Sequence, residues 1–174
     1  AEVAADELGT SFADTSYAAQ SKLAMARLYM DKNRDQDAAD ALSAMLEDSA
    51  SPELKQLARL RLARILLYQD KPQEVVDLLE GQESAGFAPA YGEVLGDAYH
   101  ALGRIADAEA AYQAVLLDPL AQGTTDQQLV QWKALDLPQV SAEELPQEIP
   151  STEPSAEPAA EPAPDADAAE ESAE

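Results

Sequence analysis

Cysteine is absent from this 174-residue sequence, and histidine occurs once, as His100. Without cysteine the chain can form no structural disulfide, catalytic thiol or thiolate metal site. His100 has no second histidine at the spacing of a metal-binding pair, and the seven glycines are scattered singly rather than gathered in a phosphate-binding loop. We therefore expect no enzyme activity, no metal site and no cofactor.

Basic residues are scarce as well. The chain holds 11 Lys and Arg residues against 34 Asp and Glu residues, which gives a net charge of −23. The segment 139–174 contains 11 of the acidic residues and no basic one, so residues 1–138 still carry a net charge of −12. Because both parts repel phosphate groups, this balance argues against a nucleic-acid partner and against charge-driven binding to an anionic membrane.

Long apolar runs are also missing, so the sequence shows no membrane span and no signal peptide. The chain begins at Ala1 rather than at a methionine and enters helix-forming sequence at once. Such a start is typical of a processed or trimmed N-terminus, and it leaves room for a membrane anchor upstream.

Proline is concentrated near the C-terminus, where five residues recur at four-residue spacing: Pro146, Pro150, Pro154, Pro158 and Pro162. The rest of that segment is largely Ala, Ser and acid, and it has too little apolar area to offset chain entropy. We therefore predict two parts, a repeat domain over residues 1–138 and a disordered Pro/Ala/Glu-rich tail over residues 139–174. The role of the tail stays open between a solvated spacer and an electrostatic decoy for basic partners.

The first 138 residues carry apolar side chains at helical spacing. These patterns, bounded by capping residues, prolines and polar turns, predict a series of short helices. The expected helices cover residues 2–12, 17–30, 35–48, 53–68, 72–81 and 124–137, with two more between residues 89 and 119 on either side of Gly103.

The segment 89–119 resembles a helical hairpin of the tetratricopeptide (TPR) type, in which a small residue on each helix lets the partner backbone approach. Its marker positions recur earlier in the chain with shifts of 33 and 37 residues, close to the ~34-residue TPR period. The three sets are Gly96, Tyr99, Gly103, Ala108 and Tyr112; Ala63, Leu66, Asp70, Val75 and Leu79; and Ala26, Tyr29, Asn33, Ala38 and Leu42. This recurrence predicts an all-α fold: a TPR-like helical-hairpin solenoid wound as a right-handed superhelix. We expect its last helix to cover the end of the stack, with Trp132 as the largest side chain that packs against it.

A stack of hairpins presents its first helices on a concave groove, where peptides are commonly held. The candidate groove residues lie one position after each small residue and one turn to either side. They are Leu23, Arg27, Met30, Leu60, Arg64, Leu67, Glu93, Asp97 and His100. Their mixture of apolar and charged side chains predicts a partner-binding surface. In the alternative interpretation, the leucines pack on a neighbouring helix and the arginines only offset the acidic surroundings.

Three stretches carry a family resemblance: residues 60–64 (LRLAR), residues 17–46 with Asp31, Lys32 and Asn33 at the turn, and residues 95–112. Together they resemble the periplasmic domain of the ancillary SecYEG translocon subunit family, the YfgM-type TPR-like proteins. Residues 129–137 are similar to the last helix of that family, and the similarity spans most of residues 5–137. Members carry one N-terminal transmembrane helix, so the resemblance implies a single-pass inner-membrane protein whose domain faces the periplasm.

The resemblance also implies partners. These are the SecYEG translocon, a membrane-anchored parvulin-like periplasmic chaperone and unfolded secreted proteins. We therefore expect a non-enzymatic protein–protein interaction module that works with periplasmic chaperones on secreted proteins. The alternative is a TPR scaffold for assembly of an envelope complex unrelated to the translocon. The sequence departs from the family pattern because it lacks the anchor and the first repeat helix and because it carries the acidic proline tail.

Overall fold

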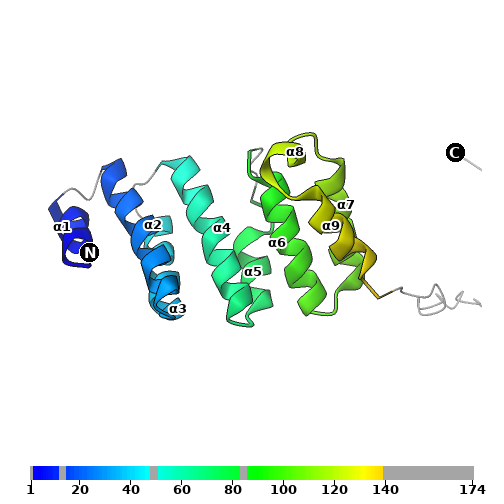
Figure 1. Cartoon of the computed structure of the whole chain (residues 1–174), viewed down its shortest axis with the longest axis horizontal. Coiled ribbons are helices and arrows are strands. Elements are labelled where there is room, and N and C mark those ends of the chain that lie inside the picture. The colour runs from blue at the N-terminus through cyan, green and yellow to red at the C-terminus, as the bar shows by residue number, and fades with distance from the viewer. Residues whose placement is uncertain (1, 12–14, 48–50, 83–85, 139–174) are drawn as a thin grey trace, which may run out of the picture. The chain divides into compact units, whose positions relative to one another are not determined.

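The computed structural model describes residues 2–11, 15–47, 51–82 and 86–138, so the tail expected over residues 139–174 lies outside the described residues. Within them the chain is all α-helix and contains no strand, which confirms the expected fold class (Figure 1). The helices are α1 (Glu2–Ser11), α2 (Ser16–Asp31), α3 (Asp35–Glu47), α4 (Pro52–Tyr68), α5 (Pro72–Leu79), α6 (Ala88–Ala101), α7 (Ile105–Leu117), α8 (Ala121–Thr124) and α9 (Gln127–Leu135). The short helix α8 is the one that the sequence pattern did not predict.

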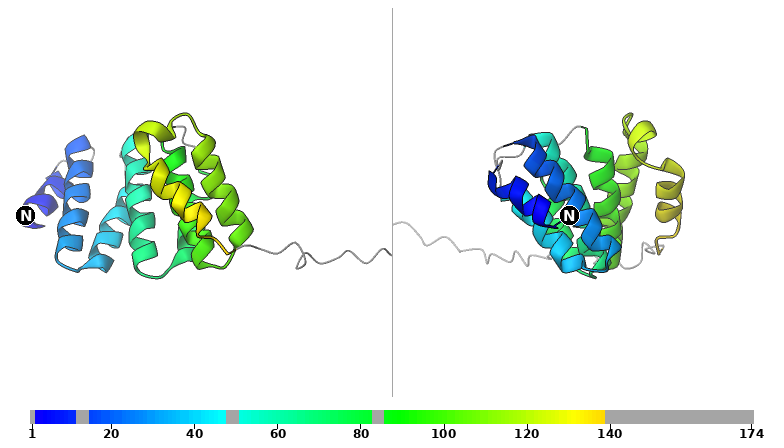
Figure 2. Two further views of the ribbon diagram at one scale, coloured as in Figure 1. Left: turned by 45° about the vertical axis from the view of Figure 1, so that its right-hand side comes forward. Right: turned by 60° about the vertical axis from the view of Figure 1, so that its left-hand side comes forward.

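The helices pair as hairpins that follow one another in chain order (Figures 1 and 2). The pairs are α2 with α3, α4 with α5, and α6 with α7. Each hairpin packs on the next through α3 against α4 and through α5 against α6, while α1 lies on α2 and α9 lies on α7. Because each unit contacts only its neighbours, the packing is that of a helical-hairpin solenoid.

The core confirms the repeat alignment at its small positions. Ala26, Ala63 and Gly96 are all buried, and each lies on the first helix of its hairpin. The facing positions on the second helices are Leu42, Leu79 and Tyr112, and all three are at most 2% exposed. Every hairpin therefore buries a small residue on its first helix and a large one on its second, as the sequence predicted, and Gly96 lies directly against the Tyr112 ring.

The three hairpin turns share one backbone conformation. Asn33, Asp70 and Gly103 have φ angles of 55°, 58° and 72°, in the left-handed region. They occupy the same place in the repeat alignment, and Asn, Asp and Gly are the residues that adopt this conformation most readily. The turn chemistry was therefore readable from the sequence, including Asp70, where no glycine marks the turn.

The helix starts follow local capping rules. The Ser51 side chain accepts a hydrogen bond of 3.4 Å from the backbone N–H of Leu54, with Pro52 at the first helical position of α4. Asp126 caps α9 by accepting bonds of 3.1 and 3.2 Å from the N–H groups of Gln128 and Leu129. In both helices a side-chain oxygen satisfies backbone donors that would otherwise be unpaired.

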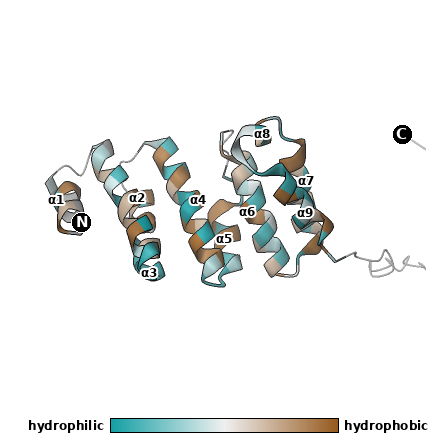
Figure 3. Ribbon diagram, viewed as in Figure 1, coloured by the Kyte–Doolittle hydropathy of each residue, from teal (hydrophilic) through white to brown (hydrophobic). Residues whose placement is uncertain are grey.

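The expectation for Trp132 was wrong. Its side chain is 60% exposed, and α9 instead buries Val130 against the stack, followed by Leu137 just beyond the helix. Apolar and polar stretches alternate along α9 (Figure 3), with Leu129, Val130, Trp132 and Leu135 as its large apolar residues. Periodicity alone could not choose between the two faces. The Val130 face packs inward because it also directs Lys133 towards α6, where two carboxylates hold it.

Candidate functional site

An apolar cleft of about 250 Å³ opens between α2, α3 and α4. Among the described helices α4 packs directly on α6, whereas α2 has no comparable packing on α4. The repeat shift between the hairpins of α2 and α4 is 37 residues, against 33 for the next pair, and α3 has 13 residues where α5 has 8. The cleft is lined by Ala26, Arg27 and Met30 from α2, Leu42 from α3, and Arg61, Arg64 and Ile65 from α4.

The floor and the rim of the cleft differ in chemistry. Ala26, Leu42 and Ile65 are buried and form the apolar floor, and Met30 is half-buried beside them. The rim consists of the three exposed arginines at positions 27, 61 and 64. A peptide side chain could therefore lose its contact with water on the floor while its polar neighbours meet cations at the rim.

The rim arginines are not engaged by acidic side chains of their own domain. Within the described residues, none of the three forms an ion pair. Two other arginines provide the contrast, since Arg34 binds Asp37 at 2.5 Å and Arg104 binds Asp107 at 2.7 Å. Each of these two also lies over a tyrosine ring at about 4.5 Å from its centroid.

Charge is separated between the two helices of each of the first two hairpins. The helices α2 and α4, which flank the cleft, together carry six Lys or Arg residues and only two acidic ones. The second helices of the same hairpins, α3 and α5, carry six acidic residues and no Lys or Arg. A chain with a net charge of −23 thus concentrates its cations beside an apolar cleft. This arrangement favours an acidic ligand there.

Three of the nine predicted groove residues line the cleft, namely Arg27, Met30 and Arg64. The sequence analysis missed Arg61, which lies three residues before Arg64 and therefore one turn away on the same face of α4. That spacing was visible in the sequence, but the repeat alignment places Ala and Val at the matching positions of the other units. The role of these residues in partner binding stays a prediction.

The remaining predicted residues lie elsewhere. Leu23 and Leu60 are buried in the hydrophobic core, and Leu67 packs against it half-buried. His100 is exposed in the last turn of α6. Glu93 and Asp97 lie half-buried on α6, where both contact α9. The structure therefore does not bring all nine side chains into one surface.

Lys133 of α9 binds both of those carboxylates. Its Nζ donates to Glu93 Oε1 at 2.9 Å and to Asp97 Oδ2 at 2.8 Å. The other oxygen of Asp97 accepts a hydrogen bond of 2.7 Å from the hydroxyl of Tyr112. Burial alone would lower the pKa of Lys133, but the hydrogen bonds and charges of Asp97 and Glu93 outweigh it and raise that pKa. This part of the predicted groove is thus covered by the last helix.

The stability of the domain is expected to fall above about pH 10. Burial, the hydrogen bond to Asp97 and the nearby negative charges raise the pKa of Tyr112, and the pKa of Lys133 is raised as well. Groups whose pKa is higher in the folded state stabilise it fully below their unfolded pKa, about 10 here, and lose that contribution as the pH rises. Urea unfolding at stepped alkaline pH should show the decline. The Tyr112→Phe variant should decline less steeply, and an equal slope in both proteins would contradict the assignment.

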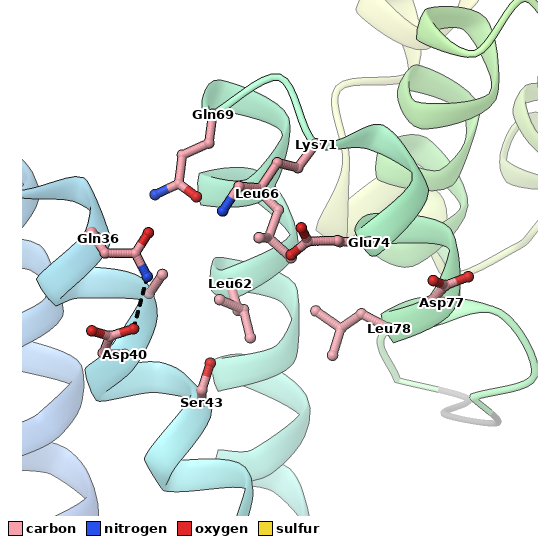
Figure 4. Close-up of a pocket in the computed structure, with 11 residues that line it drawn as sticks. Gln36, Asp40, Ser43, Leu62, Leu66, Gln69, Lys71, Glu74, Asp77 and Leu78 are labelled. Atoms are coloured by element: carbon pink, nitrogen blue, oxygen red, sulfur yellow. Dashed lines mark hydrogen bonds between the residues drawn. The ribbon is translucent and has the colours of Figure 1, made fainter.

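A second cavity of about 380 Å³ lies between α3, α4 and α5 (Figure 4). Its lining mixes apolar and polar side chains, and its charged residues are Asp40, Glu74 and Asp77 beside a single cation, Lys71. Gln36 donates a hydrogen bond of 2.8 Å to Asp40 across this surface. This cavity is the larger one and also has buried apolar residues, Ala39, Leu62 and Leu66, but its rim carries carboxylates instead of arginines.

A comparison with protein-family models matches residues 1–139 to the tetratricopeptide repeat-like domain. The chain belongs to this family. The match agrees with the stacked hairpins and with the repeat alignment. Tetratricopeptide repeat-like domains are typically non-enzymatic folds that bind other proteins. Searches of curated proteins and of solved structures give no significant match. None of the helices in the described residues is long and apolar enough to cross a membrane.

Proposed function

We propose that this tetratricopeptide repeat-like domain is a non-enzymatic interaction module that holds a segment of a partner protein in the cleft between α2 and α4. The observation that carries this proposal is the apolar cleft of about 250 Å³ with its rim of arginines, which form no ion pair with the residues that the structure describes. Its volume is below the ~300 to 1,000 Å³ typical of sites for drug-sized ligands, so it suits one or two side chains of a peptide. Affinity would come from several such contacts along the stack rather than from one deep pocket.

We further propose that the partner belongs to the secretion machinery of the inner membrane. The support is the resemblance to the ancillary SecYEG translocon subunit family over most of residues 5–137, together with the family membership of the domain. In this proposal the domain faces the periplasm from a single-pass anchor. There it works with the translocon and a membrane-anchored parvulin-like chaperone on unfolded secreted proteins.

Site-specific photo-crosslinking in membranes tests both parts. A photoreactive amino acid at Met30, which lies in the cleft, is expected to give adducts with translocon subunits, with the chaperone or with secreted chains. The matched control is Glu109, which is exposed on α7 outside the cleft. Equal labelling from the two positions would reject the cleft as the binding site. Adducts from Met30 with other envelope proteins alone would favour the alternative of an envelope-assembly scaffold.

A further inference from the structure

We propose that the cleft between α2 and α4 selects acidic–apolar peptide segments, in which an aliphatic or aromatic side chain is flanked by carboxylates. This inference rests on the proposed function, because it names the chemistry of the segment that the domain would hold. The inference also includes Arg61 among the binding residues and gives the bound segment a negative charge.

The apolar half of the ligand follows from the floor of the cleft. Ala26, Leu42 and Ile65 are at most 6% exposed, and Met30 borders them. The floor has three rigid aliphatic groups and one flexible thioether. Met adapts its shape to different apolar side chains, so the floor should accept either a leucine-like or a phenylalanine-like anchor.

The acidic half follows from the rim. Arg27 lines the cleft from α2, whereas Arg61 and Arg64 line it from α4, so exposed arginines border the cleft on both sides. A guanidinium binds a carboxylate through two parallel hydrogen bonds, and none of the three is occupied by an ion pair within the described part of the chain. A basic segment would instead bring its cations against three arginines.

The acidity of the whole chain does not oppose this preference at the site. At physiological ionic strength, charges farther away than about 8 Å are largely screened. The three rim arginines line the cleft itself, and the helices α2 and α4 carry a threefold excess of cations over anions. A peptide fits the cleft better than an anionic bilayer, because a flat membrane surface cannot place a side chain on the recessed floor.

Fluorescence anisotropy with the full chain tests the inference with three labelled, amidated hexapeptides. The probes are Glu-Glu-Leu-Phe-Glu-Glu, the basic peptide Lys-Lys-Leu-Phe-Lys-Lys and the apolar-free peptide Glu-Glu-Ser-Ser-Glu-Glu. We expect the first to bind about tenfold more tightly than either of the others, which corresponds to a few exposed ion pairs and one buried anchor. A free-acid version of the first peptide shows whether a terminal carboxylate serves as well as side-chain carboxylates.

Charge reversal supplies the matched variants. Arg61→Glu/Arg64→Glu should weaken binding of the acidic–apolar peptide about tenfold or more, whereas Lys32→Glu/Lys71→Glu changes the net charge equally outside the cleft and should alter it less than about twofold. Thermal melting of each variant verifies folding.

Several results would overturn the inference. Binding of the basic peptide with equal affinity would contradict the charge preference, and equal binding of the apolar-free peptide would contradict the anchor. Arginine-dependent binding to phosphatidylglycerol vesicles without peptide binding would assign the site to a membrane. If Met30 still crosslinks to partners in membranes while no acidic preference appears, only this inference fails. If the peptide binds in the cleft but Met30 gives no adduct, the proposed function fails instead.

Discussion

Gly96→Ala is expected to destabilise the repeat domain by about 2 to 3 kcal/mol, because an added methyl group overpacks a closed core. A Cβ atom at this position would lie 2.6 Å from Cδ1 and 2.9 Å from Cζ of the Tyr112 ring, with Cε1 closer still. Real side chains do not tolerate such contacts, so either the ring or the backbone of α6 must shift. Urea denaturation at neutral pH gives the difference in unfolding free energy from the change in midpoint.

The Tyr112 ring has little freedom to move away. It is 1% exposed, and its hydroxyl donates a hydrogen bond of 2.7 Å to Asp97. The matched control is Gly123→Ala, since no atom lies within 4 Å of the added group there and the backbone is not in the left-handed region. We expect this control to change stability by less than about 0.5 kcal/mol. Equal effects of the two substitutions would show that the close approach at Gly96 does not matter.

The other hairpins supply a rescue for Gly96→Ala. They place Ala26 opposite Leu42 and Ala63 opposite Leu79, where the third hairpin has Gly96 opposite Tyr112. The double variant Gly96→Ala/Tyr112→Leu copies their combination. Its loss of stability should therefore be smaller than the sum of the two single losses, by about 1 to 2 kcal/mol. Strict additivity would mean that the two residues do not form one packing unit.

The repeat positions could be predicted from the sequence because their constraints are local. A small residue, a large residue and a turn residue each leave a mark at a fixed place in the repeat, and the three left-handed turns at Asn33, Asp70 and Gly103 confirm it. The faces of α9 could not be predicted in the same way, because Val130 and Trp132 are both apolar. Only contact with α6 and α7 decides which of them is buried.

The cleft was predicted only in part for a related reason. Arg27 and Arg64 were found through the repeat alignment, but the width of the gap between α2 and α4 depends on how two hairpins stack. The repeat shift of 37 residues in place of 33 shows that the spacing changes between these hairpins, not by how much. The pairing of Lys133 with Glu93 joins residues 40 positions apart and has no counterpart in the other repeats. Sequence reasoning therefore left Glu93 and Asp97 in an open groove.

Lys133→Met is expected to destabilise the domain by about 2 kcal/mol and to loosen α9 before the rest of the stack. The side chains of Lys133, Glu93 and Asp97 are 25%, 15% and 30% exposed, so water only partly replaces the missing ammonium group. Removing one member of a buried ion pair costs about 3 to 5 kcal/mol, and the residual exposure reduces that figure. The two carboxylates would also repel each other across the vacated position.

A local loosening of α9 would distinguish the ion-pair role of Lys133 from a contribution to packing in general. Hydrogen exchange should show faster amide exchange in α9 of Lys133→Met, with little change in α2, which lies at the other end of the packing order. Lys32→Met provides the control. Lys32 is exposed in the turn between α2 and α3, so its replacement should have little effect on stability. Replacing the carboxylates as well, in Lys133→Met/Glu93→Gln/Asp97→Asn, should restore most of the lost stability because no unpaired charge remains. If the triple variant were no more stable than Lys133→Met, α9 would be held by Val130 and Leu137 alone, and the charges would contribute nothing to its docking.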